Sequence, residues 1–348
     1  MTSPPVAEEI PHFLEVHGER RVDPFFWMRE RESEKVLNHL KAENSYTETV
    51  LSPVRALREK VLGEMKSRIK QDDSSYPFLQ KGYRYYRRFH SGKEYPIFAR
   101  KKKDSEKEEV LLDVNEVSKG RAFTEVHFPE ISPDSAKMIY AADFGGRRFY
   151  DIYVKDLSTG KILGSPIRKT TGNVAWAADS QTFFYSKQDP ETLRSRWIYR
   201  HDPGAEKDVL VYEEKDDTFD VSVHASRTDS FLFIVSSSTL SSEWRILDAR
   251  RPKEKAKVFL PREKDHEYSL EDGGEAFYVV SNWQAKNFRL LKAPHQPVSK
   301  DQWMEIIPHR SDVLLEGATF FKTHFVLSER FGGQTRLAVV NRRSEEHT

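Results

Sequence analysis

The serines are the residues of this sequence with the clearest potential for chemistry, because a serine on a strand–turn–helix elbow can act as a nucleophile. Such an elbow has the pattern G-x-S-x-G, since only glycines tolerate the close packing around its strained turn. No serine in the sequence has a glycine two positions before it. The sequence therefore predicts no catalytic serine, and we expect these serines to lie in turns and strands.

A second candidate is His266, which lies between two acidic residues, Asp265 and Glu267. This triplet could suggest a metal site or an acid–base cluster. Adjacent residues of a strand point to opposite faces, however, so the three side chains cannot converge. The sequence also contains no cysteine and none of the motifs HExxH, GxxxxGKS/T and GxGxxG. We therefore expect no catalytic residue, no metal and no cofactor in this chain.

Two adjacent arginines, Arg147 and Arg148, follow the turn sequence Asp143-Phe144-Gly145-Gly146. A long polar loop of this kind could reach an opposing domain and form ion pairs that hold the two together. The alternative is an exposed basic turn without a partner. Both interpretations stay open, and this pair is the one candidate for an interdomain contact.

Composition and charge argue against two classes of partner. The formal net charge is +1, which gives no electrostatic reason to expect nucleic acid or an anionic membrane. The first thirty residues carry several acidic residues and no apolar run, so they do not form a signal peptide. No stretch approaches the ~18 consecutive apolar residues of a membrane span. We expect a soluble cytoplasmic protein.

The elements that must position these residues begin with two helical patterns. One covers Arg31–Leu51, and the other follows Ser52-Pro53, which is typical of an N-cap with proline in the first turn. The second helix carries an apolar stripe at helical spacing, formed by Val54, Leu57, Val61, Met65 and Ile69. This pattern predicts a helical hairpin packed on something larger.

From Gln71 onward the sequence favours short strands separated by turns, with no helix between them. The predicted strands are Tyr83–Phe89, Pro96–Arg100, Val110–Asp113, Lys137–Ala141, Tyr150–Lys155, Thr182–Ser186, Trp197–His201, Phe231–Ser236, Ala276–Ser281 and His324–Ser328. The segment Asp72–Ser75 is expected to be a linker or a hinge.

One turn-and-strand motif recurs along this region. It reads Ser132-Pro133-Asp134-Ser135 before one strand and Ala177-Ala178-Asp179-Ser180 before another. Looser copies place turns near residues 82, 134, 179, 229, 273 and 322, at intervals of 44 to 52 residues. A four-stranded propeller blade has a similar length, about 40–50 residues, whereas a β-sandwich gives no reason for such a repeat. The sixth copy is followed by only about twenty residues of β pattern, so we expect about five and a half blades.

Several longer motifs carry a family resemblance. They are His17-Gly18-Glu19-Arg20-Arg21-Val22-Asp23-Pro24-Phe25-Phe26-Trp27-Met28-Arg29, Glu43-Asn44-Ser45-Tyr46, Gly82-Tyr83-Arg84-Tyr85, Glu94-Tyr95-Pro96, Tyr212-Glu213-Glu214-Lys215-Asp216-Asp217-Thr218-Phe219 and Lys264-Asp265-His266-Glu267-Tyr268-Ser269-Leu270. On these motifs the chain resembles the oligopeptidase B group of the prolyl oligopeptidase family of serine peptidases, from about residue 10 to residue 342.

The resemblance implies a cytoplasmic peptidase that cleaves short peptides after Lys or Arg. In that family a seven-bladed propeller covers an α/β-hydrolase domain, which holds the catalytic serine, acid and histidine. The resemblance therefore predicts three segments here. Residues 1–71 would be a helical extension that packs on the hydrolase domain, 72–342 a propeller truncated in its sixth blade, and 343–348 a non-native tail.

The main functional hypothesis is thus the non-catalytic N-terminal and propeller region of such a peptidase, with the hydrolase domain absent and the propeller restricting substrate size. Its expected partners are that missing domain and short basic peptides. A second hypothesis is a stand-alone propeller that binds other proteins. A third is an independent enzyme with its site in the propeller channel.

Overall fold

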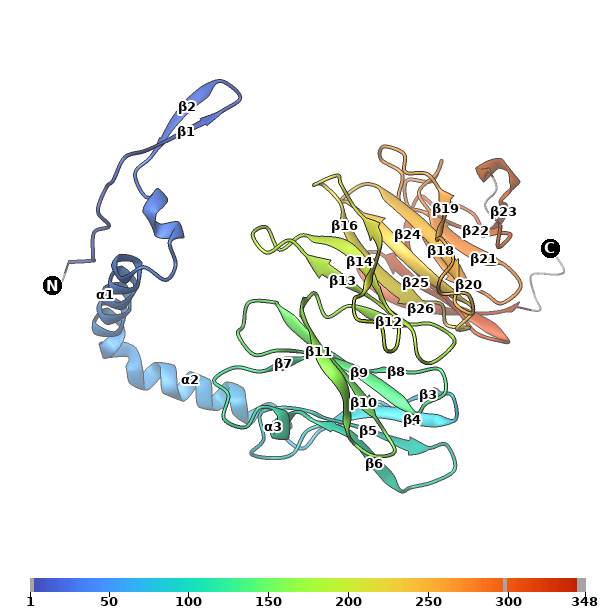
Figure 1. The fold of residues 1–348 in the computed structure, drawn as a ribbon, viewed down its shortest axis with the longest axis horizontal. Coiled ribbons are helices and arrows are strands. Elements are labelled where there is room, and N and C mark those ends of the chain that lie inside the picture. The colour runs from blue at the N-terminus through green and yellow to red at the C-terminus, as the bar shows by residue number, and fades with distance from the viewer. Residues whose placement is uncertain (1–2, 297–298, 343–348) are drawn as a thin grey trace. The chain divides into compact units, whose positions relative to one another are not determined.

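The computed structural model describes residues 3–296 and 299–342, and the chain divides into two compact units, Met1–Asp73 and Ser74–Thr348. The predicted non-native tail, residues 343–348, lies outside the described residues. Figure 1 shows helices in the first unit and β-strands through nearly all of the second. The predicted order, a helical segment followed by antiparallel β structure, is confirmed.

The N-terminal unit opens with a short hairpin. Its elements are β1 (His12–Val16), β2 (Glu19–Asp23) and the 3-10 helix η1 (Phe26–Arg29). The ring of His12 stacks on Phe26 at 3.8 Å, and the indole N–H of Trp27 donates a hydrogen bond of 2.9 Å to the carbonyl of Glu8. These contacts hold η1 against the start of β1 and the segment that precedes it.

The helical segment is one continuous run and not the predicted hairpin. It consists of α1 (Glu34–Leu51), η2 (Ser52–Val54) and α2 (Arg55–Ser67). Ser52 has helical dihedral angles and its hydroxyl donates to the carbonyl of Thr49 at 2.8 Å, so the prediction of an N-cap there was wrong. Pro53 fits because its fixed φ suits a helical turn and its missing N–H is tolerated in the 3-10 stretch.

The true N-cap of the helical run is Ser33, whose hydroxyl accepts a hydrogen bond of 3.3 Å from the backbone N–H of Val36. Within the described residues, no helix combines the length and the apolarity that crossing a membrane requires.

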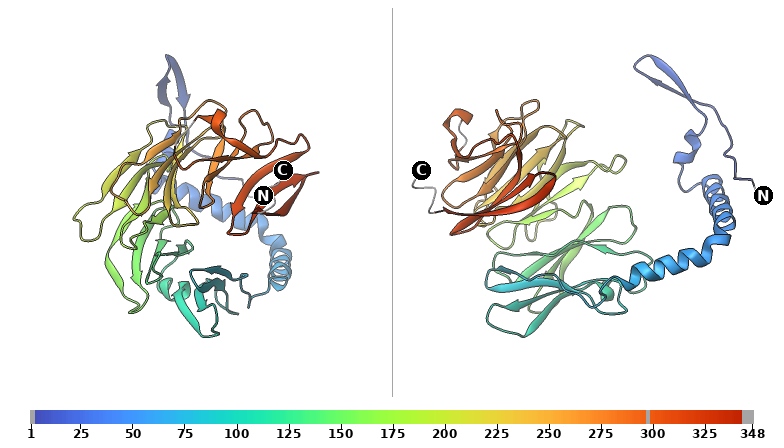
Figure 2. Two further views of the ribbon diagram at one scale, coloured as in Figure 1. Left: turned by 90° about the vertical axis from the view of Figure 1, so that its right-hand side faces the viewer. Right: turned by 180° about the vertical axis from the view of Figure 1, so that it is seen from behind.

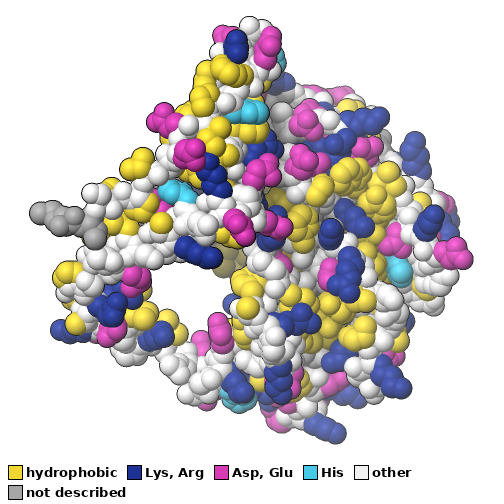
Figure 3. Space-filling view, turned by 60° about the vertical axis from the view of Figure 1, so that its left-hand side comes forward, with side chains coloured by type: hydrophobic (Ala, Val, Ile, Leu, Met, Phe, Trp, Pro, Cys, Tyr) yellow, Lys and Arg dark blue, Asp and Glu magenta, His cyan; other side chains and the backbone are white. Residues whose placement is uncertain are grey.

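The apolar stripe of α2 is exposed in this chain. Leu57 is 60% exposed and Met65 is 59% exposed, and Val61 and Ile69 are exposed as well. Apolar side chains are visible at the surface of the N-terminal unit in Figure 3. A stripe at helical spacing normally faces a core, whereas this one stays exposed among the described residues.

The second unit contains six antiparallel sheets, numbered here sheet 1 to sheet 6 in chain order. Sheet 1 contains β3 (Phe78–Gln80), β4 (Tyr83–Arg88), β5 (Ile97–Lys102) and β6 (Glu108–Asp113). The short helix α3 (Val114–Val117) follows. Sheet 2 contains β7 (Glu125–Val126), β8 (Glu130–Ile131), β9 (Lys137–Asp143), β10 (Tyr150–Asp156) and β11 (Ile162–Thr170).

The next two sheets have four strands each. Sheet 3 contains β12 (Val174–Trp176), β13 (Phe183–Gln188), β14 (Ser195–His201) and β15 (Val209–Glu213). Sheet 4 contains β16 (Asp220–Ala225), β17 (Phe231–Ser237), β18 (Ser242–Asp248) and β19 (Lys257–Leu260).

The last two sheets differ in strand number. Sheet 5 contains β20 (Tyr268–Asp272), β21 (Phe277–Ser281), β22 (Arg289–Ala293), the 3-10 helix η3 (Lys300–Gln302) and β23 (Met304–Ile307). Sheet 6 contains β24 (Val313–Phe320), β25 (His324–Phe331) and β26 (Gln334–Asn341).

The chain therefore forms a six-bladed β-propeller, and the prediction of about five and a half blades was wrong. The turn that was expected to begin each blade lies between the first and second strands of five sheets, and in sheet 2 it follows both β7 and β8. Each blade therefore begins before its turn, so the last one already has β24 before residue 322 and two further strands after it.

The repeated turn owes its shape to an aspartate followed by a residue with left-handed backbone. The carboxylate of Asp134 accepts from the N–H of Ala136 at 3.0 Å, and the carboxylate of Asp179 accepts from the N–H of Thr182 at 2.8 Å. Ser135 and Ser180 have φ of 61° and 57°. The motif is therefore an Asx turn, a local structure that aspartate and serine favour.

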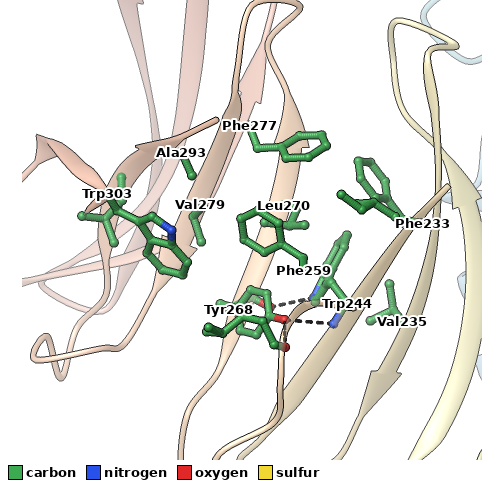
Figure 4. Close-up of a cluster of buried hydrophobic side chains, with 13 residues drawn as sticks. Phe233, Val235, Trp244, Phe259, Tyr268, Leu270, Phe277, Val279, Ala293 and Trp303 are labelled. Carbon is green, nitrogen blue, oxygen red and sulfur yellow. Dashed lines mark hydrogen bonds between the residues drawn. The ribbon is translucent and has the colours of Figure 1, made fainter. Parts of the chain in front are cut away.

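The core of the propeller is divided among five buried clusters, each formed between two consecutive sheets. Figure 4 shows the cluster between sheets 4 and 5. There Tyr268 donates its hydroxyl to the carbonyl of Leu260 at 2.7 Å and accepts from the N–H of Trp244 at 3.0 Å. These bonds satisfy the polar atom of a large buried aromatic residue and fix the spacing of the two sheets.

The first strands of the sheets lie closest to the axis of the propeller. Contacts join β8 with β12, β12 with β16 and β20 with β24. Figure 2 (left) shows the six sheets arranged around a common centre. Among the described residues no buried cluster joins sheet 6 to sheet 1.

Candidate functional site

The loop between β9 and β10 carries the two arginines singled out in the sequence. Asp143 organises this loop because its buried carboxylate accepts hydrogen bonds from the N–H groups of Gly145 at 2.8 Å and Arg148 at 2.8 Å. The side chain of Gln188, in the neighbouring sheet 3, donates to the carbonyl of Arg148 at 2.6 Å. The hydrogen bonds of Asp143 and Gln188 thus fix the backbone conformation of the loop.

The side chains of Arg147 and Arg148 are exposed. Within residues 3–296 and 299–342, neither guanidinium forms a hydrogen bond or an ion pair with a side chain. A basic pair on an ordered loop, with no internal partner, remains accessible to another surface. The structure places the pair on an exposed loop, and the interdomain contact itself stays a prediction.

A polar pocket of about 420 Å³ lies beside this loop, between sheets 2 and 3. It is lined by His127, Phe128, Glu130, Thr171, Gly172, Asn173, Val174, Ser186, Ser195 and Val221. The ring of His127 packs against Tyr150, the residue that ends the loop, with centroids 4.1 Å apart. Loop and pocket therefore belong to one side of the propeller, where the chain also passes from each sheet to the next.

Two polar side chains of this pocket bond the backbone of sheet 4, and the hydroxyls of Thr171 and Ser186 bond each other. The hydroxyl of Ser195 donates to the carbonyl of Val221 at 2.6 Å. The amide of Asn173 bonds both the N–H and the carbonyl of Val223, at 2.8 and 2.9 Å. These groups join sheets 3 and 4, so the pocket has the chemistry of a binding surface and not that of a nucleophile paired with a base.

The arrangement closest to a catalytic dyad is the hydrogen bond of 2.9 Å between His266 Nε2 and the hydroxyl of Ser281. Both residues are buried, and His266 Nδ1 has no hydrogen-bond partner, so no carboxylate orients the ring. Burial lowers the pKa of His266. This pair lacks the third group and the solvent access that nucleophilic catalysis requires.

The residues that flank His266 point elsewhere. Asp265 is exposed, while the backbone of Asp265 and of Glu267 is bound by the side chain of Asn282. In the described part of the chain, no group of three histidine, aspartate or glutamate side chains is placed to hold a metal ion.

The centre of the propeller holds a charged contact that sequence reasoning did not identify. Lys81, in the turn after β3, forms an ion pair of 2.8 Å with Asp229, in the turn after β16. Sheets 2 and 3 separate these two turns along the ring, so the pair crosses the centre. Glu130 lies within electrostatic reach of Lys81.

The protein atoms around Glu130 raise the pKa of its carboxyl, and the ammonium of Lys81 opposes this rise, while the residue itself stays exposed. The signal that could have found this site was the alignment of the repeated turns, because residues 81 and 229 occupy equivalent positions in it. Which two of these turns come into contact depends on how the sheets are arranged around the propeller axis, and the alignment does not give that arrangement.

The motif Tyr212–Phe219 has a structural role at the junction of sheets 3 and 4. Glu214 is buried, and its carboxylate accepts from the guanidinium of Arg262 at 2.5 Å and from the hydroxyl of Tyr212 at 2.8 Å. Burial alone would raise the pKa of Glu214, but these hydrogen bonds and the N–H of Asp216 outweigh it and lower the pKa to about 2. The ionised carboxylate joins the two sheets.

Comparison with known proteins extends these observations. The chain matches the family model described as "Prolyl oligopeptidase, N-terminal beta-propeller domain" over residues 4–348. It is 38% identical over 360 residues to "Dipeptidyl aminopeptidase BI" of Pseudoxanthomonas mexicana, covering 97% of this chain and 50% of that protein. It is 29% identical to "Protease 2" of Moraxella lacunata, covering 97% of this chain and 50% of that protein.

Solved structures give the same result. Oligopeptidase B from Leishmania major superimposes with a TM-score of 0.91 at 30% identity, covering 99% of this chain and 52% of that chain. Oligopeptidase B from Trypanosoma brucei, in a closed form with covalently bound antipain, gives a TM-score of 0.89 at 28% identity and covers 98% of this chain and 51% of that chain. The chain spans about half the length of the curated relatives it matches.

Proposed function

The chain belongs to the prolyl oligopeptidase family, as the region that forms its N-terminal β-propeller, and from this premise we propose that it is the non-catalytic half of a serine oligopeptidase. The complete enzyme would cleave short peptides after Lys or Arg, and the propeller would restrict the size of the peptides that reach the catalytic half. The observation that carries this proposal is that the described residues form the six sheets of a propeller and the sequence has no G-x-S-x-G motif, while its relatives are about twice as long.

The ion pair between Lys81 and Asp229 supports the restriction of substrate size. It joins opposite sides of the ring at its centre, where a peptide passing through the propeller would have to displace it. Breaking a partly buried pair leaves two desolvated charges, which opposes the entry of a long chain.

The partner of this region would be an α/β-hydrolase domain. Two surfaces of the chain suit it: the exposed apolar stripe of α2 and the ordered basic loop with Arg147 and Arg148. An apolar helix face gains stability when another surface covers it, and the arginines would add ion pairs with acidic residues of the partner.

The proposal is tested with a chimera in which this chain replaces the N-terminal half of dipeptidyl aminopeptidase BI. We expect the chimera to hydrolyse short peptides and to leave long, unstructured polypeptides intact, whereas the isolated 348-residue chain hydrolyses neither. Rates would be measured on a ladder of fluorogenic peptides of increasing length. Hydrolysis by the isolated chain at the rate of a complete enzyme would overturn the proposal, as would a chimera without any length limit.

The DNA that follows the codon for Thr348 tests whether a catalytic half is encoded next to this chain. A downstream reading frame that encodes G-x-S-x-G would provide the complete enzyme, and we expect that enzyme to prefer Arg and Lys esters. A stop codon there, together with a sharply melting monomer, would favour a stand-alone protein-binding propeller.

The role of the basic loop is tested in the complete enzyme by replacing Arg147 and Arg148 with alanine. If the loop holds the two halves together, the KM for short peptides should change and small-angle scattering should show a larger radius of gyration. Replacing the exposed pair Arg250 and Arg251, on another turn, provides a charge-matched control. Unchanged scattering and unchanged KM would overturn this role.

A further inference from the structure

A second pocket lies between sheets 2 and 3. It is lined by other residues than the loop with Arg147 and Arg148 that joins β9 and β10. It has a volume of about 260 Å³. Its lining residues are Lys137, Val154, Leu163, Gly164, Trp176, Gln181, Phe183, His201, Pro203 and Gly204. It shares no residue with the pocket beside Arg147 and Arg148 and is independent of the proposed peptidase function.

The walls of this pocket are largely apolar and aromatic. Trp176 and Phe183 meet edge to face with ring centroids 5.5 Å apart, and both are buried. Leu163 is 41% exposed and forms a wall on the solvent side. Such walls suit a flat apolar body, because aromatic rings gain from edge-to-face and offset contacts as well as from burial.

Two of the polar groups that line the pocket are already occupied. The ammonium of Lys137 donates to the carbonyl of Ser180 at 3.0 Å, and the indole N–H of Trp176 donates to the carbonyl of Glu130 at 3.1 Å. The polar group that remains on the aromatic wall is the imidazole of His201, which stacks on Phe183 with centroids 4.7 Å apart.

The orientation of His201 is fixed by a carboxylate. Its Nδ1 lies 2.8 Å from one oxygen of Asp208, and the other oxygen of Asp208 accepts from the hydroxyl of Tyr185 at 2.6 Å. Asp208 can only accept, so Nδ1 carries the proton of the neutral ring. His201 Nε2 then keeps a lone pair and has no hydrogen-bond partner among the described residues, and His201 is one of the residues that line the pocket.

We propose that this pocket binds a small phenol, whose hydroxyl donates to His201 Nε2 while its ring lies against Trp176 and Phe183. A cavity of about 150 Å³ with apolar walls can hold benzene, so about 260 Å³ accommodates a single ring with one further substituent. A ligand with one donor and an apolar body satisfies the acceptor on the aromatic wall, while the exposed Gln181 at the pocket remains accessible to water.

The probe is 4-fluorophenol, observed by fluorine NMR with the 348-residue chain and with the chimera described above. The matched probe 4-fluoroanisole has the same ring but cannot donate. We expect the phenol to bind at least ten times more tightly than the anisole. N-acetyltyrosinamide is the third probe, and binding of it in preference to 4-fluorophenol would assign the pocket to a tyrosine side chain of a peptide.

Two variants separate the hydrogen bond from the cavity. Asp208→Asn should present an amide N–H to Nδ1, move the ring proton to Nε2 and abolish the preference for phenol over anisole. Leu163→Trp should fill the pocket and abolish binding of both probes. Leu210→Trp is the control, since Leu210 is similarly exposed, lies on β15 at the outer edge of sheet 3, and does not line the pocket.

Circular dichroism checks that each variant keeps its β structure. Equal affinity for phenol and anisole in the unaltered protein would overturn the proposal. Unchanged phenol binding in Leu163→Trp would also overturn it, because the ligand would then lie elsewhere.

Discussion

Gly172 occupies a position in the polar pocket that no other residue can fill without strain. Its φ is +82°, and a Cβ atom there would lie 2.6 Å from Nδ1 of His127 and 3.1 Å from the ring of Tyr150. Tyr150 ends the arginine loop, so the packing of one glycine is linked to the position of the candidate interdomain contact.

Replacing Gly172 by alanine should lower the free energy of unfolding by about 2–4 kcal/mol, because left-handed backbone strain adds to overpacking. The matched variant Gly160→Ala has a similar φ of +72° with no atom within 4 Å. In this variant only the left-handed backbone strain should lower the free energy of unfolding, by about 1–2 kcal/mol. Urea denaturation measures both, and equal losses would show that His127 moves aside freely.

Glu214 gives a second prediction at the scale of single residues, one that depends on pH. Its pKa is lowered to about 2 from the ordinary value of 4.5, so it binds a proton less readily in the folded protein than in the unfolded chain. Its stabilising contribution is therefore fully present above pH 4.5 and is lost as the pH falls toward 2.

Glu214→Gln should accordingly lower the free energy of unfolding by about 2–3 kcal/mol at pH 7 and by much less near pH 2.5. Urea midpoints at the two pH values measure this difference. Glu116→Gln is the control, since Glu116 forms only an exposed ion pair with Lys119 and should change stability at neither pH. A loss of equal size at both pH values would contradict the ionic role.

At the scale of elements, β26 stands out as an edge strand with apolar side chains at the surface. Leu337 is 72% exposed and Val339 is 70% exposed. The strand pairs with β25 on one side, and the described residues provide no neighbour on the other. Exposed edges with apolar side chains can pair with other chains.

Replacing both Leu337 and Val339 by lysine should shift the isolated chain from aggregates toward the monomer, because charges at an edge oppose strand pairing. Size-exclusion chromatography with light scattering measures the change. Leu240→Lys provides the control, since Leu240 is 55% exposed but lies in the loop between β17 and β18. If that variant had the same effect, net charge and not the edge would govern association.

The strands and the two helices were largely predictable from sequence, and the connection between the helices was not. Strands such as Tyr83–Arg88 and Phe231–Ser237 are short, aromatic or β-branched, and bounded by turn residues, so local sequence determines them. The helical hairpin was a wrong prediction because Pro53 is compatible both with the start of a helix and with a 3-10 turn inside one. Local sequence does not distinguish these two cases.

The candidate site was predictable only in part for a similar reason. The exposed loop with Arg147 and Arg148 follows from its own glycines and from Asp143, which are neighbours in sequence. The pairing of Lys81 with Asp229 depends on the number and tilt of the sheets between them. Likewise, His201 and Tyr185 are oriented by Asp208, a residue that no sequence motif connects with them.

At the scale of the whole molecule, the ion pair across the ring should affect which peptides are cleaved. In the chimera with a catalytic half, replacing Lys81 and Asp229 together by alanine should raise the length of peptide that is hydrolysed. Lys300→Ala is the control, since Lys300 in η3 pairs at 2.7 Å with Glu263, in the segment between β19 and β20, and this pair does not cross the centre. An unchanged length limit would show that substrate size is restricted elsewhere.

The five buried clusters have a further consequence, which concerns the order in which the propeller opens. Each cluster binds only two consecutive sheets, so the sheets form a row of nearest neighbours with two ends. Sheets 1 and 6 are each held by a single cluster, whereas sheets 2 to 5 are held by two. Amide hydrogens should therefore exchange with solvent deuterium first in sheets 1 and 6 and last in sheets 3 and 4.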